Sequence, residues 1–227
     1  MNAVIVQSQD AITLVGGGPV RRRDLALAMV RAPCLVAADS GADRLLAAGV
    51  QPRAVIGDMD SLSAAAHARL PAERLFAIAE QETTDFDKAL RSVAAPFVLA
   101  LGVLGARLDH ALAALNALVR HRGAPCLLIS PDDVVFHAPP GQRLQLRLGI
   151  GDRLSLFPLA EVRGESIGLH WPINGLGFAP GGMIGTSNRV SARDVELSFA
   201  NPGMLVILPR VRLDAAIRAL VPAWHGV

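Results

Sequence analysis

The sequence predicts an α/β domain built on a parallel sheet, followed by an antiparallel all-β domain. Up to residue 130, short apolar runs alternate with amphipathic segments of helical spacing, which is typical of strands and helices that alternate around a parallel sheet. After Pro131 the segments alternate strictly between polar and apolar residues and are separated by Gly and Pro turns, which indicates half-buried antiparallel strands. The change of pattern spans residues 130–141, and we assign residues 1–135 to the first domain and 136–227 to the second.

Within the first domain, each expected strand is a short apolar run and each expected helix repeats its apolar residues every three or four positions. The strands are expected at 12–15, 34–38, 54–56, 75–79, 97–101 and 126–130, and the helices at 22–31, 42–48, 63–70, 84–93 and 108–119. The last helix has the clearest pattern, with one apolar face made of Leu108, Ala111, Leu112, Leu115, Leu118 and Val119. This order of elements predicts a Rossmann-like fold.

In the second domain the clearest strands are expected at 142–148, 153–156 and 195–199, where every second residue is apolar. No convincing helical pattern precedes the last residues of the chain. Gly and Pro between these segments indicate turns.

The composition describes a folded protein of nearly neutral charge. Of 227 residues, 52% are hydrophobic and 19% charged, with a formal net charge of +2, which excludes a disordered chain and gives no general attraction to nucleic acid or anionic lipid. The two cysteines lie in apolar runs, as expected for core residues of a reduced protein. The N-terminus lacks a secretory pattern, and the longest apolar stretch is too broken to span a bilayer. We expect a soluble cytoplasmic protein without nucleic-acid or membrane partners.

Polar, acidic or glycine-rich segments follow five successive strands of the first domain. They occupy residues 16–23, 39–43, 57–61, 81–88 and 105–110, and seven of the chain's 14 aspartates lie between Asp39 and Asp109. Ligands of doubly wound sheets bind at the carboxyl ends of the strands. We therefore expect these five segments to converge on one site.

Three of these aspartates and a lysine predict a Mg²⁺ site for phosphoryl chemistry. Asp58 and Asp60 point the same way in an extended segment, and Asp85 could close the site from the next loop. Hard carboxylate oxygens are the ligands that Mg²⁺ prefers. Lys88 is the only lysine beside 21 arginines, which indicates that position 88 requires an ammonium, able to neutralise a phosphate.

Each of these features also has an ordinary structural interpretation. Thr84 with the acidic residues after it fits a helix N-cap, and the glycines at 16–18 could form a tight turn, since no P-loop motif is present. Asp43 and Arg44 look like a surface pair. The functional interpretation is favoured because five strand ends carry such segments together.

These motifs, in this order, resemble the thiamine pyrophosphokinase (thiamine diphosphokinase) family. The family's DGGAN-like segment reads DSGAD at 39–43, its GDxDS segment is unchanged at 57–61, and its QDxTDxxK-like segment reads QETTDFDK at 81–88. Its GGRxDH segment reads GARLDH at 105–110, and its TSN segment is found at 186–188. The resemblance covers nearly the whole chain and implies that the second domain is a β-sandwich.

The resemblance implies transfer of the diphosphoryl group of ATP to the hydroxyl of thiamine, which yields thiamine diphosphate and AMP. It also implies a homodimer whose active site lies at the subunit interface. Carried over by position, Asp58, Asp60 and Asp85 would hold Mg²⁺, with Lys88 and Asp39 completing the catalytic set. ATP would contact Gly17, Gln81, Thr84, Lys88, Arg107 and Asp109, and thiamine would contact Trp171, Thr186, Ser187 and Asn188. Either Asp39 or Asp85 could act as general base, and Trp171 could instead belong to the core.

Three positions depart from the family's pattern: Ser40, Asp43 and Ala106. A serine at position 40 would be strained if the backbone there needs a positive φ.

Two other interpretations of the chain stay open. Asp58 to Ser61 also resembles the DxDx[ST] core of haloacid-dehalogenase-type phosphatases, in which the first Asp is a nucleophile, although that motif usually follows the first strand. A non-catalytic, dimeric nucleotide-binding module would keep the fold without needing the complete set of Asp58, Asp60, Asp85 and Lys88.

Overall fold

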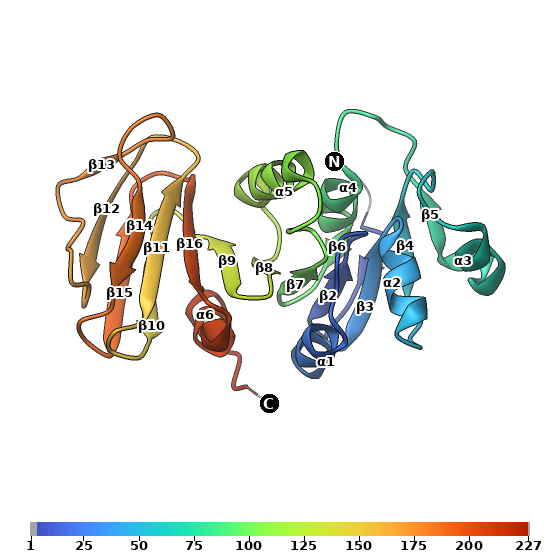
Figure 1. The fold of residues 1–227 in the computed structure, drawn as a ribbon, viewed down its shortest axis with the longest axis horizontal. Coiled ribbons are helices and arrows are strands. Elements are labelled where there is room, and N and C mark those ends of the chain that lie inside the picture. Colours follow the sequence, from blue (N-terminus) through green and yellow to red (C-terminus); the bar gives the residue numbers. More distant parts are fainter. Residues whose placement is uncertain (1–3, 227) are drawn as a thin grey trace. The chain divides into compact units, whose positions relative to one another are not determined.

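The structure is a computed structural model that describes residues 4–226 (Figure 1). The chain forms two compact units that divide between Ser130 and Pro131. The predicted boundary at residue 135 falls inside strand β9 (Asp133–His137), which pairs with β16 (Met204–Pro209) of the second unit. This pairing explains why the division comes before β9.

The first unit is built on six parallel strands in the order β8-β7-β2-β3-β4-β5. Their bounds are β2 (Ile12–Val15), β3 (Cys34–Ala38), β4 (Ala54–Gly57), β5 (Leu75–Ala77), β7 (Val98–Leu101) and β8 (Cys126–Ile129). Every residue of β2, β4, β7 and β8 is buried, as expected for a parallel sheet covered on both faces. All six strands lie where the apolar runs predict them.

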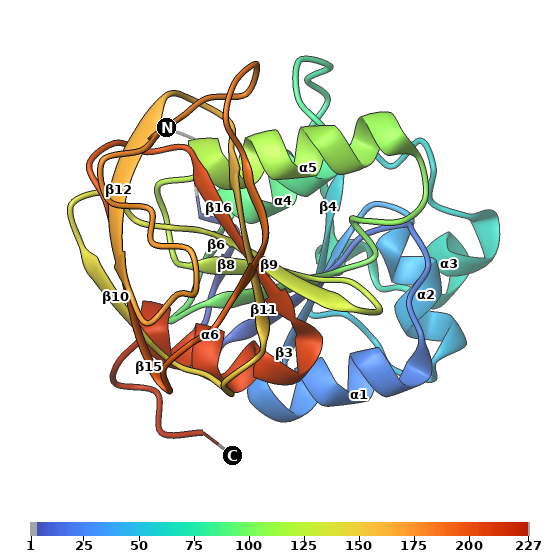
Figure 2. The ribbon, with the colours of Figure 1, turned by 60° about the vertical axis from the view of Figure 1, so that its left-hand side comes forward.

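Helices connect these strands, and α4 and α5 lie together on one side of the sheet with α1 on the other (Figure 2). The helical segments are α1 (Arg22–Arg31), α2 (Gly41–Ala47), α3 (Ala64–Arg69), η1 (Ala72–Arg74), α4 (Asp85–Arg91) and α5 (Leu108–Arg120). A separate two-stranded pair joins β1 (Val6–Gln7) to β6 (Val93–Ala94). Residues 6–7 are thus a short strand, while positions 1–3 lie outside the described residues.

The apolar face predicted for α5 is only partly correct. Ala114, Ala117 and Leu118 are buried, but Leu108 and Leu112 are 76% and 56% exposed. The side of α5 that packs is rich in alanine, and small side chains allow a helix to approach its neighbours closely. The leucine pattern therefore indicates the helix correctly but not its buried side.

The second unit contains two four-stranded antiparallel sheets, ordered β14-β11-β16-β9 and β10-β15-β12-β13. The strands not yet given are β10 (Arg143–Arg147), β11 (Arg153–Pro158), β12 (Val162–Ile167), β13 (Gly177–Phe178), β14 (Gly185–Arg189) and β15 (Asp194–Phe199). In β10, burial alternates residue by residue, so one face of this strand packs inward as predicted.

The expectation of an all-β second domain is wrong at its end. Residues Arg210–Arg212 form the short helix η2, and Leu213–Leu220 form α6, which buries Leu213, Ala216 and Ile217. These buried residues are three and four positions apart, which is the spacing of one helix face. No helix within residues 4–226 is long and apolar enough to cross a membrane.

Candidate active site

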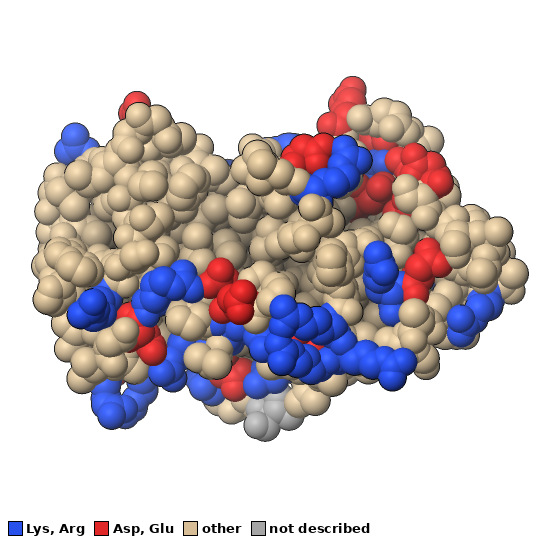
Figure 3. Space-filling view, viewed as in Figure 1, with Lys and Arg blue, Asp and Glu red and all other residues tan. Residues whose placement is uncertain are grey.

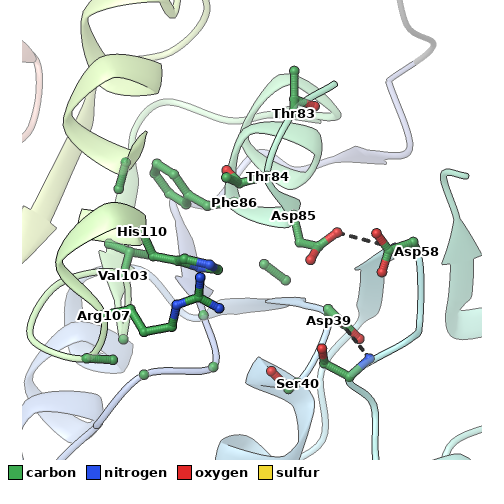
Figure 4. A pocket seen from close by; sticks show the side chains of 18 of the residues that line it. Asp39, Ser40, Asp58, Thr83, Thr84, Asp85, Phe86, Val103, Arg107 and His110 are labelled. Carbon is green, nitrogen blue, oxygen red and sulfur yellow. Dashed lines mark hydrogen bonds between the residues drawn. The ribbon is translucent and has the colours of Figure 1, made fainter. Parts of the chain in front are cut away.

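The first unit has a cavity of about 380 Å³ among the loops that follow its strands (Figure 4). Of the residues predicted for the site, its walls include Gly17, Asp39, Asp58, Gln81, Thr84, Asp85 and Arg107. The walls further include Ser40, Ser61, Thr83, Phe86, Val103 and His110, with glycines 16, 18 and 102 and several alanines. The strand-end loops thus converge as predicted.

Two glycines allow the first two of these loops to lie against each other. A Cβ atom on Gly41 would overlap the carbonyl oxygen of Val15, at the end of β2, and one on Gly17 would overlap the hydroxyl of Ser40. Because only glycine permits such close approach, α2 begins directly against the end of β2. The start of α2 is therefore a fixed part of the cavity wall.

Three carboxylates lie close together beside this cavity; Asp39 and Asp58 line it, whereas Asp60 does not. Asp39, Asp58 and Asp60 each offer an oxygen within 4.8 Å of the others. Figure 4 shows Asp39 and Asp58 across the cavity from Arg107 and His110, with Asp85 between. In the space-filling view, acidic side chains also gather over α4 and the segment that leads to it (Figure 3).

Asp39 carries the strongest indication that this group binds a cation. It is 2% exposed, and its Oδ1 atom is buried without a hydrogen-bond partner, while its Oδ2 atom accepts a bond of 3.2 Å from the Ser61 backbone. Burial and the nearby Asp85, Asp58 and Asp60 carboxylates raise the pKa of Asp39 to about 6. A buried, unpaired oxygen among like charges is costly without a cation, so these carboxylates fit a hard metal ion.

Lys88 lies behind the acidic group and is 1% exposed. Its Nζ atom donates to Asp58 Oδ2 at 2.8 Å and to Asp85 Oδ1 at 3.0 Å, and the Asp58 backbone N–H donates to Asp85 Oδ1 at 3.3 Å. The hydrogen bond from Lys88 lowers the pKa of Asp58. Lys88 is thus paired with both Asp58 and Asp85, and the group of three mutually close carboxylates contains Asp39 and not Asp85. The expectation that Asp85 is a metal ligand stays a prediction.

Two other predicted residues have structural partners as well. Thr84 is the N-cap of α4, and its hydroxyl accepts a bond of 3.4 Å from the Asp87 backbone. Arg107 and Asp109 form a two-pronged ion pair, with N–O distances of 2.6 and 3.1 Å, in which both side chains are well exposed. Arg107 lines the cavity, whereas Asp109 is not among the lining residues and holds Arg107 from outside.

Backbone strain marks the predicted motifs. Among the described residues, three that are not glycine have a positive φ: Asp39 (44°), Met59 (68°) and Ser187 (60°). Each lies in a motif identified from the sequence, and such strain is typical of functional sites. Ser40 is not strained, because its φ is −57° and the condition of a positive φ is not met there; the positive φ belongs to the residue before it, Asp39.

The second unit has a cavity of its own, about 310 Å³ in volume. All four residues predicted for thiamine line it, together with Pro172, Ile173, Leu176, Phe178, Met183, Ile184 and Gly185. Trp171 is 52% exposed and is therefore not a core residue. Asn188 is largely buried, and its side chain bonds both the N–H and the C=O of Trp171, at 3.2 and 2.7 Å. Asn188 thus fixes the backbone that presents Trp171.

Apolar residues that line both cavities were not predicted from the sequence. Phe86 and Val103 line the first, and Met183 and Ile184, which are 48% and 43% exposed, line the second. Of these four, only Met183 and Ile184 could have been found from the sequence, because they form an apolar pair between glycines in an otherwise polar stretch.

Two family models match most of this architecture. The model described as "Thiamin pyrophosphokinase, catalytic domain" matches residues 25–128, and "Thiamin pyrophosphokinase, vitamin B1 binding domain" matches residues 142–204. Together they cover well over half of the chain. The chain belongs to the thiamin pyrophosphokinase family.

Curated relatives of this family member come from plants and a nematode. Thiamine pyrophosphokinase 1 of Oryza sativa subsp. japonica is 28% identical over 165 residues, which are 65% of this chain and 62% of the relative. Thiamine pyrophosphokinase 1 of Arabidopsis thaliana is 26% identical over 164 residues, or 65% and 61% of the two chains. The matched region therefore spans less than two thirds of the length of these relatives.

Solved structures of thiamin pyrophosphokinases share the fold over nearly the whole chain. The enzyme from Candida albicans gives a TM-score of 0.75 at 17% identity, covering 90% of this chain and 92% of its own. The one from Bacillus subtilis gives a TM-score of 0.69 at 24% identity, covering 88% and 98%. Both units of this family member thus have counterparts in known structures.

Proposed function

We propose that this chain transfers the diphosphoryl group of ATP to the primary hydroxyl of thiamine, giving thiamine diphosphate and AMP. The observation that carries the proposal is the buried, unpartnered Oδ1 atom of Asp39 within a group of three carboxylates. Asp39 and Asp58 of this group line a cavity of about 380 Å³, within the usual size range of small-ligand sites. Membership of the family supplies the identity of the substrates.

In this proposal Asp39, Asp58 and Asp60 hold Mg²⁺. When bound, the ion neutralises charge on the phosphates of ATP, which is the main requirement of phosphoryl transfer. Lys88 keeps Asp58 ionised and oriented through its bond of 2.8 Å, and Asp85 holds Lys88 in place at 3.0 Å. Asp85 thus contributes by positioning Lys88.

The remaining walls of the first cavity are proposed to hold the nucleotide. Gly17, Gln81, Thr84 and Arg107 surround it, and Phe86 and Val103 add an apolar surface. Arg107 is kept in one orientation by its two bonds to Asp109, which lowers the entropy cost of binding an anion.

The cavity of the second unit is proposed to hold thiamine. Trp171 is 52% exposed, with the Arg189 guanidinium 6.0 Å from its ring centroid, and is proposed to stack on the pyrimidine ring. Met183 and Ile184 provide apolar contact. Thr186 and Ser187 line the same cavity, and Asn188 supports Trp171. We further propose that the chain is cytoplasmic and forms a homodimer whose active site is completed at the subunit interface. In this proposal the first unit is Rossmann-like and the second is a β-sandwich.

The direct test incubates the purified chain with thiamine, ATP and Mg²⁺, with and without EDTA, and resolves the nucleotide products. Thiamine-dependent, EDTA-sensitive formation of AMP and thiamine diphosphate is expected. ADP or free phosphate formed regardless of thiamine would indicate a phosphatase or ATPase instead, and nucleotide binding without turnover would indicate a non-catalytic module.

The metal assignment is tested by Asp58→Asn and Asp60→Asn. Each removes a negative charge from the group of three carboxylates, so transfer should be abolished while circular dichroism stays like that of the wild type. The unfolding midpoint of Asp60→Asn should also stay near the wild-type value, whereas that of Asp58→Asn should fall because the buried Lys88 loses its partner at 2.8 Å. A variant that retains activity within about threefold, a barrier change well under 1.4 kcal/mol, would contradict the assignment.

A further inference from the structure

Asp43 and Arg44, at the start of α2, hold two different loops of the first cavity. Their adjacent positions suggest a surface ion pair, but the structure gives each side chain a separate partner. The start of α2 packs directly against the end of β2 at Gly41. Side chains that project from a fixed element can in turn fix what they bind.

Arg44 holds the glycine loop at residues 16–18. Its Nε and Nη2 atoms both donate to the carbonyl oxygen of Gly17, at 3.1 and 3.0 Å. Gly17 lines the cavity, and its other side lies against the hydroxyl of Ser40. The loop therefore lies between Ser40 and the Arg44 guanidinium. The guanidinium also adds positive potential beside a cavity proposed to bind phosphates.

Asp43 holds the far end of the loop that carries Asp58 and Asp60. Its Oδ2 atom accepts from the Ser63 backbone at 3.3 Å, and its Oδ1 atom accepts from the Ser63 hydroxyl. That hydroxyl in turn accepts from the Ala66 backbone at 3.1 Å and caps α3. Both carboxylate oxygens thus accept from Ser63, whereas an amide has a single acceptor oxygen and would have to donate to the Ser63 hydroxyl to keep the second contact.

We propose that Asp43 and Arg44 are positioning residues for diphosphoryl transfer, each responsible for one substrate-binding loop. Arg44 sets the glycine loop for the nucleotide, and Asp43 sets the loop that places the metal carboxylates. This inference rests on the proposed function, because it assigns the two loops to ATP and Mg²⁺.

The Arg44 part is tested by Arg44→Met and Arg44→Lys, with Arg69→Met on α3 as the matched control. Loss of two charge-assisted bonds should raise the KM for ATP about tenfold in Arg44→Met, with kcat within about twofold and the KM for thiamine unchanged. Lysine keeps the charge but not the planar fork, so its effect should be intermediate. Calorimetric binding of a non-hydrolysable ATP analogue should weaken by the same factor.

The Asp43 part is tested by Asp43→Asn and Ser63→Ala, with Glu73→Gln as control. Each variant should raise the Mg²⁺ concentration for half-maximal activity about threefold to fivefold, and the double variant should add little, because both remove the same contact. Ser63→Thr keeps the hydroxyl and should behave like the wild type, and calorimetric titration with Mn²⁺ should show the same order of affinities.

The outcomes separate this inference from the proposed function. An inactive wild type would remove the proposed function itself, whatever the variants do. With an active wild type, two results would overturn the inference. One is a KM for ATP in Arg44→Met equal to that of the control Arg69→Met. The other is a Mg²⁺ dependence in Asp43→Asn equal to that of the control Glu73→Gln. Variants that lower kcat alone, with KM and metal dependence unchanged, would show a merely structural role and would also overturn it.

Discussion

Lys88 is the only lysine of the sequence, and it is buried between two carboxylates. Every other cationic position except the histidines is an arginine, so the retained lysine indicates a place where a guanidinium does not fit. A compact ammonium can bond Asp58 and Asp85 within a site that is 1% exposed, whereas a planar fork needs more room.

Lys88→Arg should therefore impair both stability and catalysis. Overpacking of this kind costs about 1–3 kcal/mol, and displacement of Asp58 should lower the transfer rate about tenfold or more. Urea unfolding and product formation measure the two effects. The reverse exchange at an exposed position, Arg120→Lys (62% exposed), should change neither; equal activity of Lys88→Arg and the wild type would show that the lone lysine is accidental.

The carboxylate of Asp39 serves the proposed metal site but lowers the stability of the metal-free fold. This carboxylate is buried among like charges, so without a metal its ionised form destabilises the fold. Asp39→Asn should raise the free energy of unfolding by about 1–3 kcal/mol at neutral pH in EDTA while it abolishes transfer. Asp10→Asn, at an exposed position, is the control, and an Asp39→Asn protein less stable than the wild type would refute this reasoning.

Single residues are predictable from the sequence where chemistry alone restricts them. The spacing of Asp58 and Asp60 and the isolation of Lys88 are enough to indicate an acidic site. The family resemblance places Asp39 in the catalytic set, but its burial, its positive φ and its place beside Asp58 and Asp60 are seen only in the structure. For the same reason the sequence does not reveal that Arg44 binds Gly17, since the two are 27 positions apart.

At the scale of elements, β2 and α1 were predicted with their observed bounds because short apolar runs and helical spacing are local signals. Strand β16 was missed: burial is continuous over its first three residues, and such a run does not distinguish a strand from a buried helix. Helix α5 was predicted, but its buried side was not, because packing partners determine which side of a helix is covered.

The end of α5 provides a test of pH dependence. His121 follows the helix, and its Nε2–H donates to the Ala124 carbonyl at 3.1 Å. Burial lowers the pKa of His121 below its usual 6.5, and the charge of Arg122 adds to this effect, although the bond to Ala124 and the charge of Asp87 oppose it. Below about pH 6.5 the unfolded chain therefore binds a proton that the folded chain does not, and the free energy of unfolding falls as the pH is lowered.

His121→Gln should remove this contribution. Urea unfolding between about pH 7.5 and 5 should show a shallower loss of stability in the variant than in the wild type, with similar values at the upper end. His67→Gln, at an exposed position in α3, should retain the wild-type slope. A His121→Gln slope equal to that of the wild type would mean that the histidine is protonated in the folded chain.

At the scale of the whole molecule, the two-unit organisation is visible in the sequence as a change from helical spacing to strict alternation. The strand order of the second unit is not, because pairs such as β9 with β16 join residues about seventy positions apart and no local signal specifies such pairing. The two cavities lie in different units, and the proposed homodimer would allow one reaction to use both.

A complementation experiment tests that proposal. Asp58→Asn disables the first unit and Trp171→Ala weakens the second, so each homodimer should be inactive at low thiamine concentration. After the two proteins are mixed and exchange subunits, half-sites combine at random and about a quarter of wild-type activity should return. No recovery, in a mixture shown by mass spectrometry to contain heterodimers, would mean that each site is built within one subunit.

The burial of Lys88 also gives the protein an unusual reactivity. Most proteins present many lysine amines to acylating reagents, but here the single lysine ε-amine of the sequence is closed off from water. Lysine acetylation, ubiquitin attachment and amine-directed cross-linking find no accessible acceptor of this kind in the folded chain. An amine-reactive reagent reaches Lys88 only when the surrounding structure opens, so the rate of labelling at Lys88 reports how often this part of the fold opens.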